Sequence, residues 1–288
     1  MATETEHVSC SVEQLLSTAA QQLENQSEST QLDAEVLLAH VLKQSRTWLR
    51  TWPQHHLTDD TVNTYKQLVK QRHQGIPIAY LTGQRDFWLH TFKVSADVLI
   101  PRPETELLVE QCLQIIPPDK PHSILELGTG SGAIAISIAA ERKRATVTAT
   151  DISEAALAIA RSNAATTGLV NIEFIHSNWF ANLTSQRYDL IVSNPPYIPL
   201  DDEHLHRGDV RFEPRLALTS GSDGLRDIRI IVDLARQFLG NNAYLALEHG
   251  YDQADAVECI MNNHQYRNIH NYRDLQGNQR VTIAQYHC

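Results

Sequence analysis

Cysteine is scarce in this chain of 288 residues, and long apolar runs and a surplus of basic charge are absent. The four cysteines (Cys10, Cys112, Cys259 and Cys288) lie far apart, which is typical of reduced thiols and not of a disulfide framework. No apolar run reaches the length of a membrane span, and the first residues lack the basic and apolar regions of a signal peptide. We therefore expect a cytoplasmic protein without a membrane-spanning segment.

The charge balance is acidic: 24 lysines and arginines stand against 34 aspartates and glutamates, for a formal net charge of −10. A protein that binds duplex nucleic acid ordinarily has the opposite balance or a basic stripe, and no such stripe is visible. His55-His56 and His204-x-His206 would need further ligands at suitable spacing to bind a metal, and the sequence offers none. Neither a nucleic-acid partner nor a metal site is predicted.

Asn194-Pro195-Pro196-Tyr197 directly follows residues 188–193, an apolar run with the composition of a buried strand. The Asn194 side-chain oxygen and the Pro195 carbonyl can each accept a hydrogen from a planar –NH2 group. The ring of Tyr197 offers a face to a flat substrate or to a sulfonium cation. The tetrapeptide is therefore typical of a site that methylates such a nitrogen. The alternative is a strand that ends in an ordinary Pro-Pro turn.

A glycine-rich turn lies upstream: Gly128-Thr129-Gly130-Ser131-Gly132 joins the strand-like residues 123–127 to an apolar helical run at 133–140. Glycines let a ligand approach the backbone, and the free N–H groups of the helix N-terminus point toward it. Residues 146–150 predict the next strand, and Asp151 at its end is suited to accept both hydroxyls of a ribose. This segment is predicted to bind a nucleotide-like cofactor.

Two cofactors fit the glycine turn. Gly128, Gly130 and Ala133 match the G-x-G-x-x-A pattern of NAD-binding proteins. Glu126 before the turn and the compact Gly-x-Gly-x-Gly instead favour S-adenosylmethionine, which has no pyrophosphate, and a hydride-transfer enzyme has no use for Asn-Pro-Pro-Tyr. In an open α/β sheet the carboxyl ends of the first and fourth strands flank one crevice, so we expect both motifs to face a single site.

Hydrophobic periodicity predicts two domains. Residues 1–85 form a helical bundle with helices near 12–23, 32–42 and 58–74, and Ser11 and Gln14 give the first helix a capping box. Residues 87–94 and 98–100 have strand composition and predict a β-hairpin linker over residues 86–104. Strands and helices alternate in residues 105–288, which predicts an α/β domain with a mostly parallel sheet. Its strands are expected at residues 123–127, 146–150, 172–176, 188–193, 243–248 and 280–286, and its later helices near 224–239 and 253–263.

Several segments together resemble the protein-(glutamine-N5) methyltransferases of peptide chain release factors, the PrmC (HemK) family. The glycine turn is common to many methyltransferases, whereas the segments at residues 101–106 (Pro-Arg-Pro-Glu-Thr-Glu), 213–218 (Glu-Pro-Arg-Leu-Ala-Leu) and 221–225 (Gly-Ser-Asp-Gly-Leu) are more particular. The resemblance covers most of the chain. It implies a small N-terminal helical domain, a hairpin linker and a class I S-adenosylmethionine-dependent methyltransferase domain, Rossmann-like, with a seven-stranded sheet.

The resemblance also implies roles for individual residues. The five residues of the glycine turn, Asp151, Trp179 and Asn194 would bind S-adenosylmethionine. Asn194, Pro195 and Tyr197 would be catalytic, and residues 194–197 would hold the substrate glutamine. The family often has an Asp where this chain has Asn178, whose carbonyl oxygen can still accept from the adenine amino group, so altered affinity is expected.

Structural alternatives stand beside two of these assignments. Trp179 could instead be a core aromatic beneath the third strand. Residues 101–106 could simply start a helix, since proline and carboxylates favour a first turn.

The implied reaction is methylation of the glutamine side-chain amide (N5) in the Gly-Gly-Gln motif of release factors, which are then the protein partners. The alternative is an N-methyltransferase that acts on an exocyclic amino group of a nucleic-acid base, because such a group is also a planar –NH2. The acidic charge and the small helical domain weigh against that alternative. A non-catalytic role that only binds S-adenosylmethionine has no supporting feature, because the motifs are intact.

Overall fold

Two compact units make up the molecule. The computed structural model describes residues 10–24, 27 and 29–287. Tertiary contacts group residues 1–83 with the short segment 208–212, which we call the helical unit, and residues 84–207 with 213–288, which we call the sheet unit. The N-terminal residues that lack a signal-peptide pattern, and Cys288, lie outside the described residues. Cys112 and Cys259 are free thiols.

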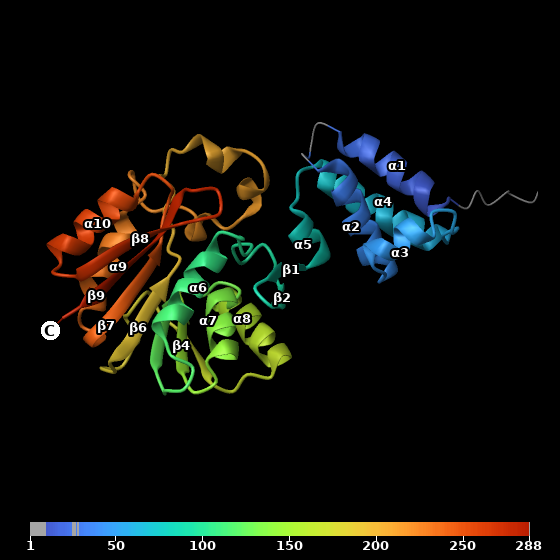
Figure 1. Cartoon of the computed structure of the whole chain (residues 1–288). Coiled ribbons are helices and arrows are strands. Elements are labelled where there is room, and N and C mark those ends of the chain that lie inside the picture. The colour runs from blue at the N-terminus through green and yellow to red at the C-terminus, as the bar shows by residue number, and fades with distance from the viewer. Residues whose placement is uncertain (1–9, 25–26, 28, 288) are drawn as a thin grey trace, which may run out of the picture. The chain divides into compact units, whose positions relative to one another are not determined.

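The helical unit contains α1 (Val12–Leu23), α2 (Thr30–Leu42), α3 (Arg46–Thr51), α4 (Asp59–His73) and α5 (Ile78–Thr82) (Figure 1). The predicted capping box of α1 is confirmed: Ser11 Oγ accepts from the Gln14 N–H, and the Gln14 side chain accepts from the Ser11 N–H. The side chains that pack the helices together include Leu37, Leu38 and Tyr65. The sequence predicted α1, α2 and α4; the two short helices were not predicted.

A buried ion pair crosses the helical unit. Arg72 of α4 donates through Nε to Asp33 of α2 at 2.7 Å, and through Nη1 to Asp209 at 2.8 Å. Asp209 begins the 3-10 helix η2 (Asp209–Phe212), which lies in the segment 208–212. Arg72 Nη1 also donates to the carbonyl of Ile76. One guanidinium therefore holds two helices and a segment from much later in the chain.

The β-hairpin is shorter than predicted and starts earlier. β1 (Gln84–Phe87) and β2 (His90–Lys93) pair antiparallel, and Trp88 in the turn has φ 53°. Residues 98–100 are not a strand, so the expected pairing of 87–94 with 98–100 is wrong. The apolar side chains that suggested the second strand, Val98 and Ile100, are buried without forming a strand, whereas Phe87 of β1 and Phe92 of β2 are buried in the core of the sheet unit.

A mixed sheet forms the centre of the second unit. Within the described residues it has seven strands in the order β5-β4-β3-β6-β7-β9-β8, with β9 antiparallel to both of its neighbours and the other pairs parallel. This order confirms the predicted class I methyltransferase fold. β8 was not predicted. The strands are β3 (Ser123–Leu127), β4 (Thr146–Asp151), β5 (Ile172–His176), β6 (Tyr188–Ser193), β7 (Leu239–Glu248), β8 (Arg267–Arg273) and β9 (Gln279–Tyr286).

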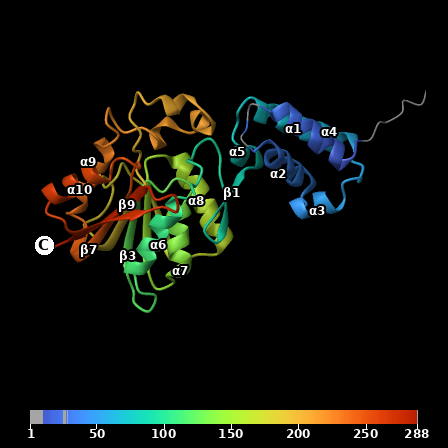
Figure 2. The same ribbon diagram turned by 45° about the horizontal axis from the view of Figure 1, so that its top comes forward.

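Helices cover both faces of the sheet (Figures 1 and 2). Neighbouring residues of β3 point to opposite faces: Ile124 packs in the cluster with α6 (Thr105–Ile115), α7 (Ala133–Glu141) and α8 (Glu154–Thr167), whereas Leu125 packs with α9 (Arg226–Ala235) and α10 (Ala254–Asn263). Short 3-10 helices, η1 (Glu203–His206) and η3 (Arg215–Ala217), lie between β6 and α9. None of the helices in the described part of the chain is both long and apolar enough to cross a membrane.

The chain changes direction across the sheet at β3. It runs from β3 to β4 and β5 on one side, then returns to place β6 on the other side of β3, where Leu127 is in register with Ser193. The two segments that follow these paired residues, the glycine turn and Asn194-Pro195-Pro196-Tyr197, therefore leave the sheet at the same edge. This is the switch point at which open α/β sheets bind ligands.

Replacing Asp33 with Asn should destabilise the helical unit by about 3 kcal/mol, because it leaves a buried Arg72 with only one carboxylate. Urea unfolding followed by circular dichroism measures the change. Glu13→Gln is the control, since Glu13 is exposed on α1 of the same unit and accepts from Gln54; it should change the free energy of unfolding by less than about 0.5 kcal/mol. Equal effects of the two substitutions would show that the buried pair adds nothing.

Candidate functional site at the ends of strands β3, β4 and β6

The glycine turn needs its glycines for two different reasons. Gly128, Gly130 and Gly132 have φ values of 71°, 55° and 84°, a region that disfavours side chains. A Cβ on Gly132 would lie 2.9 Å from Ile136 Cδ1 and 3.2 Å from Ala160 Cβ, so helices α7 and α8 approach closely there. A Cβ on Gly130 would meet no atom within 4 Å. Gly130 thus lies beside open space into which a ligand can fit.

Glu126 supports the turn from below. It is 1% exposed, and its Oε2 accepts the Thr129 hydroxyl at 2.5 Å and the Ala135 N–H at 3.0 Å. Burial raises the pKa of Glu126 to about 8, although both hydrogen bonds lower it. The residue therefore fixes the shape of the turn from inside the protein and does not face the ligand space.

Asp151 lies beside the turn, as the strand order requires. Its Oδ2 accepts the Gly130 N–H at 2.8 Å and its Oδ1 accepts the Ser153 N–H at 2.9 Å. The Thr129 N–H also donates to the Thr150 carbonyl, so the end of β4 and the turn form one rigid corner. Burial raises the pKa of Asp151. Each carboxylate oxygen keeps a lone pair for a further hydrogen bond.

Trp179 contacts both the glycine turn and the core of the sheet unit. A Cβ on Gly128 would lie 3.6 Å from Trp179 Cζ3, so the indole ring covers one side of the glycine turn. The half-buried ring also packs against the core cluster that contains Leu125 and Leu127. Trp179 has φ 49°, and Asn178 before it is exposed.

Asn194 and Pro195 present two acceptors at the end of β6. Ser193 Oγ donates to the Leu127 carbonyl at 2.8 Å and joins this end of β6 to the start of the glycine turn. Asn194 Nδ2 donates to Thr105 Oγ1 at 3.2 Å. Within the described residues, no group donates to Asn194 Oδ1 or to the Pro195 carbonyl. Both oxygens can therefore accept a further hydrogen bond.

Tyr197 is held by Glu248 and Gln253, which the sequence did not single out, and by Gly224 of the segment 221–225. Its hydroxyl donates to Glu248 Oε1 at 3.4 Å, and its carbonyl accepts from Gln253 Nε2 at 2.9 Å. A Cβ on Gly224, which has φ 74°, would lie 2.1 Å from the same carbonyl. Only glycine fits beneath the Tyr197 backbone. This explains why a glycine occupies position 224 in the Gly-Ser-Asp-Gly-Leu segment at residues 221–225.

Two further segments on which the resemblance rests, residues 101–106 and 213–218, contact each other. Glu213 is buried and accepts the Ile100 N–H at 3.2 Å, and Arg102 forms an ion pair with it. The structural alternative for residues 101–106 holds in that α6 begins at Thr105 with Glu104 as its N-cap. The same segment contacts the site through Thr105. Glu248 could have been noticed in the sequence as a carboxylate that ends an apolar strand at the ligand-binding edge.

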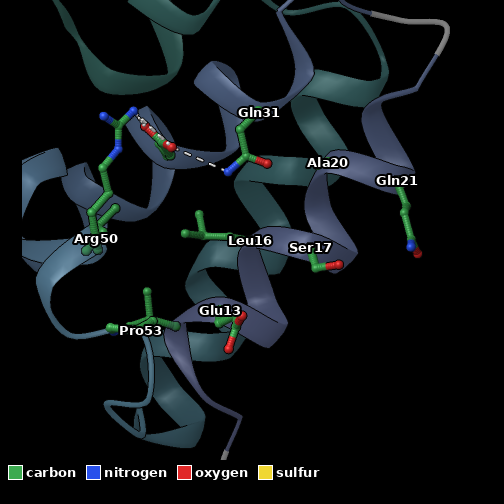
Figure 3. A pocket seen from close by; sticks show the side chains of 11 residues that line it. Glu13, Leu16, Ser17, Ala20, Gln21, Gln31, Arg50 and Pro53 are labelled. Carbon is green, nitrogen blue, oxygen red and sulfur yellow. Dashed lines mark hydrogen bonds and ion pairs between the residues drawn. The ribbon is translucent and has the colours of Figure 1, made fainter.

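A hollow of about 400 Å³ lies in the helical unit, and none of the predicted site residues lines it. Figure 3 shows Gln31 and Arg50 at its wall, and both donate to Glu35. Within the described residues, no group of three or more His, Cys, Asp or Glu side chains is arranged to hold a metal ion.

Known proteins match the chain along nearly its whole length. The PrmC N-terminal domain family matches residues 14–83, and the methyltransferase small domain family matches residues 103–206. The release factor glutamine methyltransferase of Shewanella oneidensis is 44% identical over 265 residues, which are 92% of each chain. That of Coxiella burnetii is 46% identical over 274 residues, 95% of this chain and 98% of the relative. The chain belongs to the release factor glutamine methyltransferase family.

A solved methyltransferase shares the fold. The 16S rRNA N2 G1207 methyltransferase of T. thermophilus, in complex with AdoMet and guanosine, superposes with a TM-score of 0.52 at 18% identity and covers 70% of this chain and 49% of its own. At that identity the likeness concerns the fold alone. Family membership confirms the resemblance seen in the sequence.

Gly224→Ala should reduce methyl transfer on the order of 10²-fold, because a Cβ 2.1 Å from the Tyr197 carbonyl forces the site backbone to move. Gly168→Ala is the matched control: Gly168 also has a positive φ, 68°, but its Cβ would meet no atom within 4 Å. The control should lose about 1–2 kcal/mol of stability from backbone strain and keep its activity. Equal activity of the two folded variants would contradict the role of Gly224.

Proposed function

We propose that this protein transfers a methyl group to the side-chain amide nitrogen of the glutamine in the Gly-Gly-Gln motif of peptide chain release factors. One observation carries the proposal: two unused acceptors, Asn194 Oδ1 and the Pro195 carbonyl, stand at the strand end next to the glycine turn. An amide –NH2 has two hydrogens to give to them. Relatives that align over more than nine-tenths of the chain are named release factor glutamine methyltransferases. Their name supports release factors as the substrates.

S-adenosylmethionine is the cofactor, and its sulfonium supplies the electrophilic methyl group. The residues present fit it. The open space at Gly130 admits a ligand next to backbone N–H groups, and Asp151 beside it has lone pairs for ribose hydroxyls. The ring of Trp179 offers a flat apolar surface at Gly128 for the adenine. Cofactor binding is therefore assigned to the five residues of the glycine turn, Asp151 and Trp179. Asn194 is assigned to both the cofactor and the substrate.

The substrate residues act by orientation. An amide nitrogen is a weak nucleophile because its lone pair is delocalised into the carbonyl. Asn194 Oδ1 and the Pro195 carbonyl accept its two hydrogens, which fixes the direction of the nitrogen lone pair; fixed dipoles of this kind contribute several kcal/mol without a strong base. Pro196 keeps the turn stiff, and Tyr197 contributes its ring face to the substrate.

The helical unit is assigned to recognition of the protein substrate. All residues assigned to the cofactor and to the glutamine belong to the sheet unit, yet a second unit with its own core is present. A three-residue loop tip offers little contact area, whereas stable protein interfaces bury about 1,200–2,000 Å² in total. A second contact would supply the difference. Because release factors end translation at ribosomes, the cytoplasm is the proposed place of action.

Asn194→Ala should lower the rate of methyl transfer to a release factor on the order of 10²–10³-fold, because one of two fixed acceptors is lost. Calorimetry should find S-adenosylmethionine binding within about tenfold of the native protein. Asn263→Ala, on the exposed end of α10, is the control and should leave both quantities unchanged. Near-native activity of the Asn194 variant would contradict the proposed orientation of the amide.

A chain that begins at Gln84 should still bind S-adenosylmethionine but lose most of its kcat/KM toward an intact release factor. The hairpin must be kept, because Phe87 and Phe92 belong to the core of the sheet unit. Circular dichroism and thermal unfolding confirm that the shortened chain is folded. If it is folded and methylates the whole factor as well as the full chain does, the helical unit has another role.

A further inference from the structure

Asn194 works only in one of its two amide orientations. Its side chain has an acceptor, Oδ1, and a donor, Nδ2, and the two exchange places when the amide turns over. A substrate –NH2 needs the acceptor. If Nδ2 faced the substrate, two donors would oppose each other and the nitrogen would be neither bound nor aimed. Something in the protein must therefore hold the amide in the productive orientation.

Thr105 contacts the Nδ2 end of the Asn194 amide. Its Oγ1 accepts from Asn194 Nδ2 at 3.2 Å, and the residue is 4% exposed at the start of α6. A threonine hydroxyl can either donate or accept, so this contact alone does not choose an orientation. The choice depends on where the single hydroxyl hydrogen of Thr105 goes.

Glu248 is the acceptor for that hydrogen. Its carboxyl is 1% exposed, and Thr105 is close enough for its hydroxyl to lower the pKa of Glu248. Oε1 accepts from the Tyr197 hydroxyl at 3.4 Å, whereas the buried Oε2 has no partner in hydrogen-bond geometry among the described residues. An ionised carboxyl only accepts, so this unpaired oxygen is the acceptor toward which the Thr105 hydroxyl hydrogen can turn, and Thr105 Oγ1 can then only accept from Asn194.

We infer that Thr105 and Glu248 are positioning residues that hold the Asn194 amide with Oδ1 toward the substrate nitrogen. Asn194 Nδ2 donates to Thr105 Oγ1, and in the inferred arrangement the Thr105 hydroxyl hydrogen turns toward the unpaired Oε2 of Glu248. This inference rests on the proposed function and assigns a role to the segment at residues 101–106. The two contacts join residues far apart in the sequence: Asn194 and Thr105 are 89 positions apart.

The direction of the hydrogen bonds between Asn194, Thr105 and Glu248 depends on the charge of Glu248. A protonated carboxyl can donate to Thr105, whose hydroxyl then donates to Asn194 and turns Nδ2 toward the substrate. Burial raises the pKa of Glu248 to about 7, while hydrogen bonds from Thr105 and Tyr197 and the charge of Arg280 lower it, and Glu104 raises it. Catalysis should therefore decline as the pH falls through about 7, where the carboxyl becomes neutral.

The test compares Thr105→Val, Thr105→Ser and Thr167→Val in the full chain, with labelled S-adenosylmethionine and a purified release factor. Valine keeps the shape of threonine but has no hydroxyl, so kcat should fall about 10- to 100-fold while S-adenosylmethionine binding stays within about threefold. Serine keeps the hydroxyl and should recover most of the rate. Thr167→Val removes a hydroxyl that donates to the Ala164 carbonyl in α8 and should have no effect on kcat.

The dependence of kcat on pH is the second test of the inference. The native kcat should rise with pH through a single ionisation near 7, and Glu248→Gln, which cannot ionise, should lose that rise. Near-native kcat for a folded Thr105→Val variant, or an unchanged pH profile for Glu248→Gln, would overturn the inference. If the native protein does not methylate the release factor, the proposed function fails instead, so the two failures are distinguishable.

Discussion

The parallel pairing of β3 with β6 is the constraint on which the rest of the site depends. It sets Leu127 opposite Ser193, and the Ser193 hydroxyl ties the two strand ends together. The two segments that follow those residues therefore lie at one edge of the sheet. They are the glycine turn after β3 and the Asn-Pro-Pro-Tyr segment after β6. Pairing of β3 with β4 adds Asp151 at the same edge. A shift of either register by one residue would turn alternate side chains to the opposite face and separate the two halves of the site.

Around this edge, buried polar residues and a glycine hold the backbone in place. Glu126 supports the glycine turn, Gln253 and Gly224 support Tyr197, and Glu213 supports the segment that leads to Thr105. A group that must orient a weak nucleophile has to be held by neighbours whose own hydrogen bonds are complete. This requirement explains the signature segments: Thr105 contacts Asn194, Gly224 lies beneath Tyr197, and Glu213 holds the segment that leads to Thr105.

The sequence predicted those parts of the site that depend on local chain geometry. The glycine turn, Asp151 after its strand and the Asn-Pro-Pro-Tyr segment each follow directly from a short run of residues, and the strand order then brings them together. The contact of Thr105 with Asn194 and that of Glu248 with Tyr197 join distant segments, so no local pattern indicates them. The hairpin was misplaced because apolar residues near Val98 and Ile100 look like a strand, yet these side chains are buried outside the sheet. The second-last strand, β8, is largely polar and gave no alternating signal.

The most direct measurement of the central claim is the destination of the methyl group. The purified protein would be incubated with methyl-labelled S-adenosylmethionine and, in separate reactions, with a release factor, with DNA and with RNA. Mass spectrometry of the release factor would locate the label. We expect label only on the release factor, on the side-chain amide of the glutamine in its Gly-Gly-Gln motif, and none when that glutamine is replaced. Label on a nucleic-acid base, or on a different atom of the release factor, would contradict this expectation.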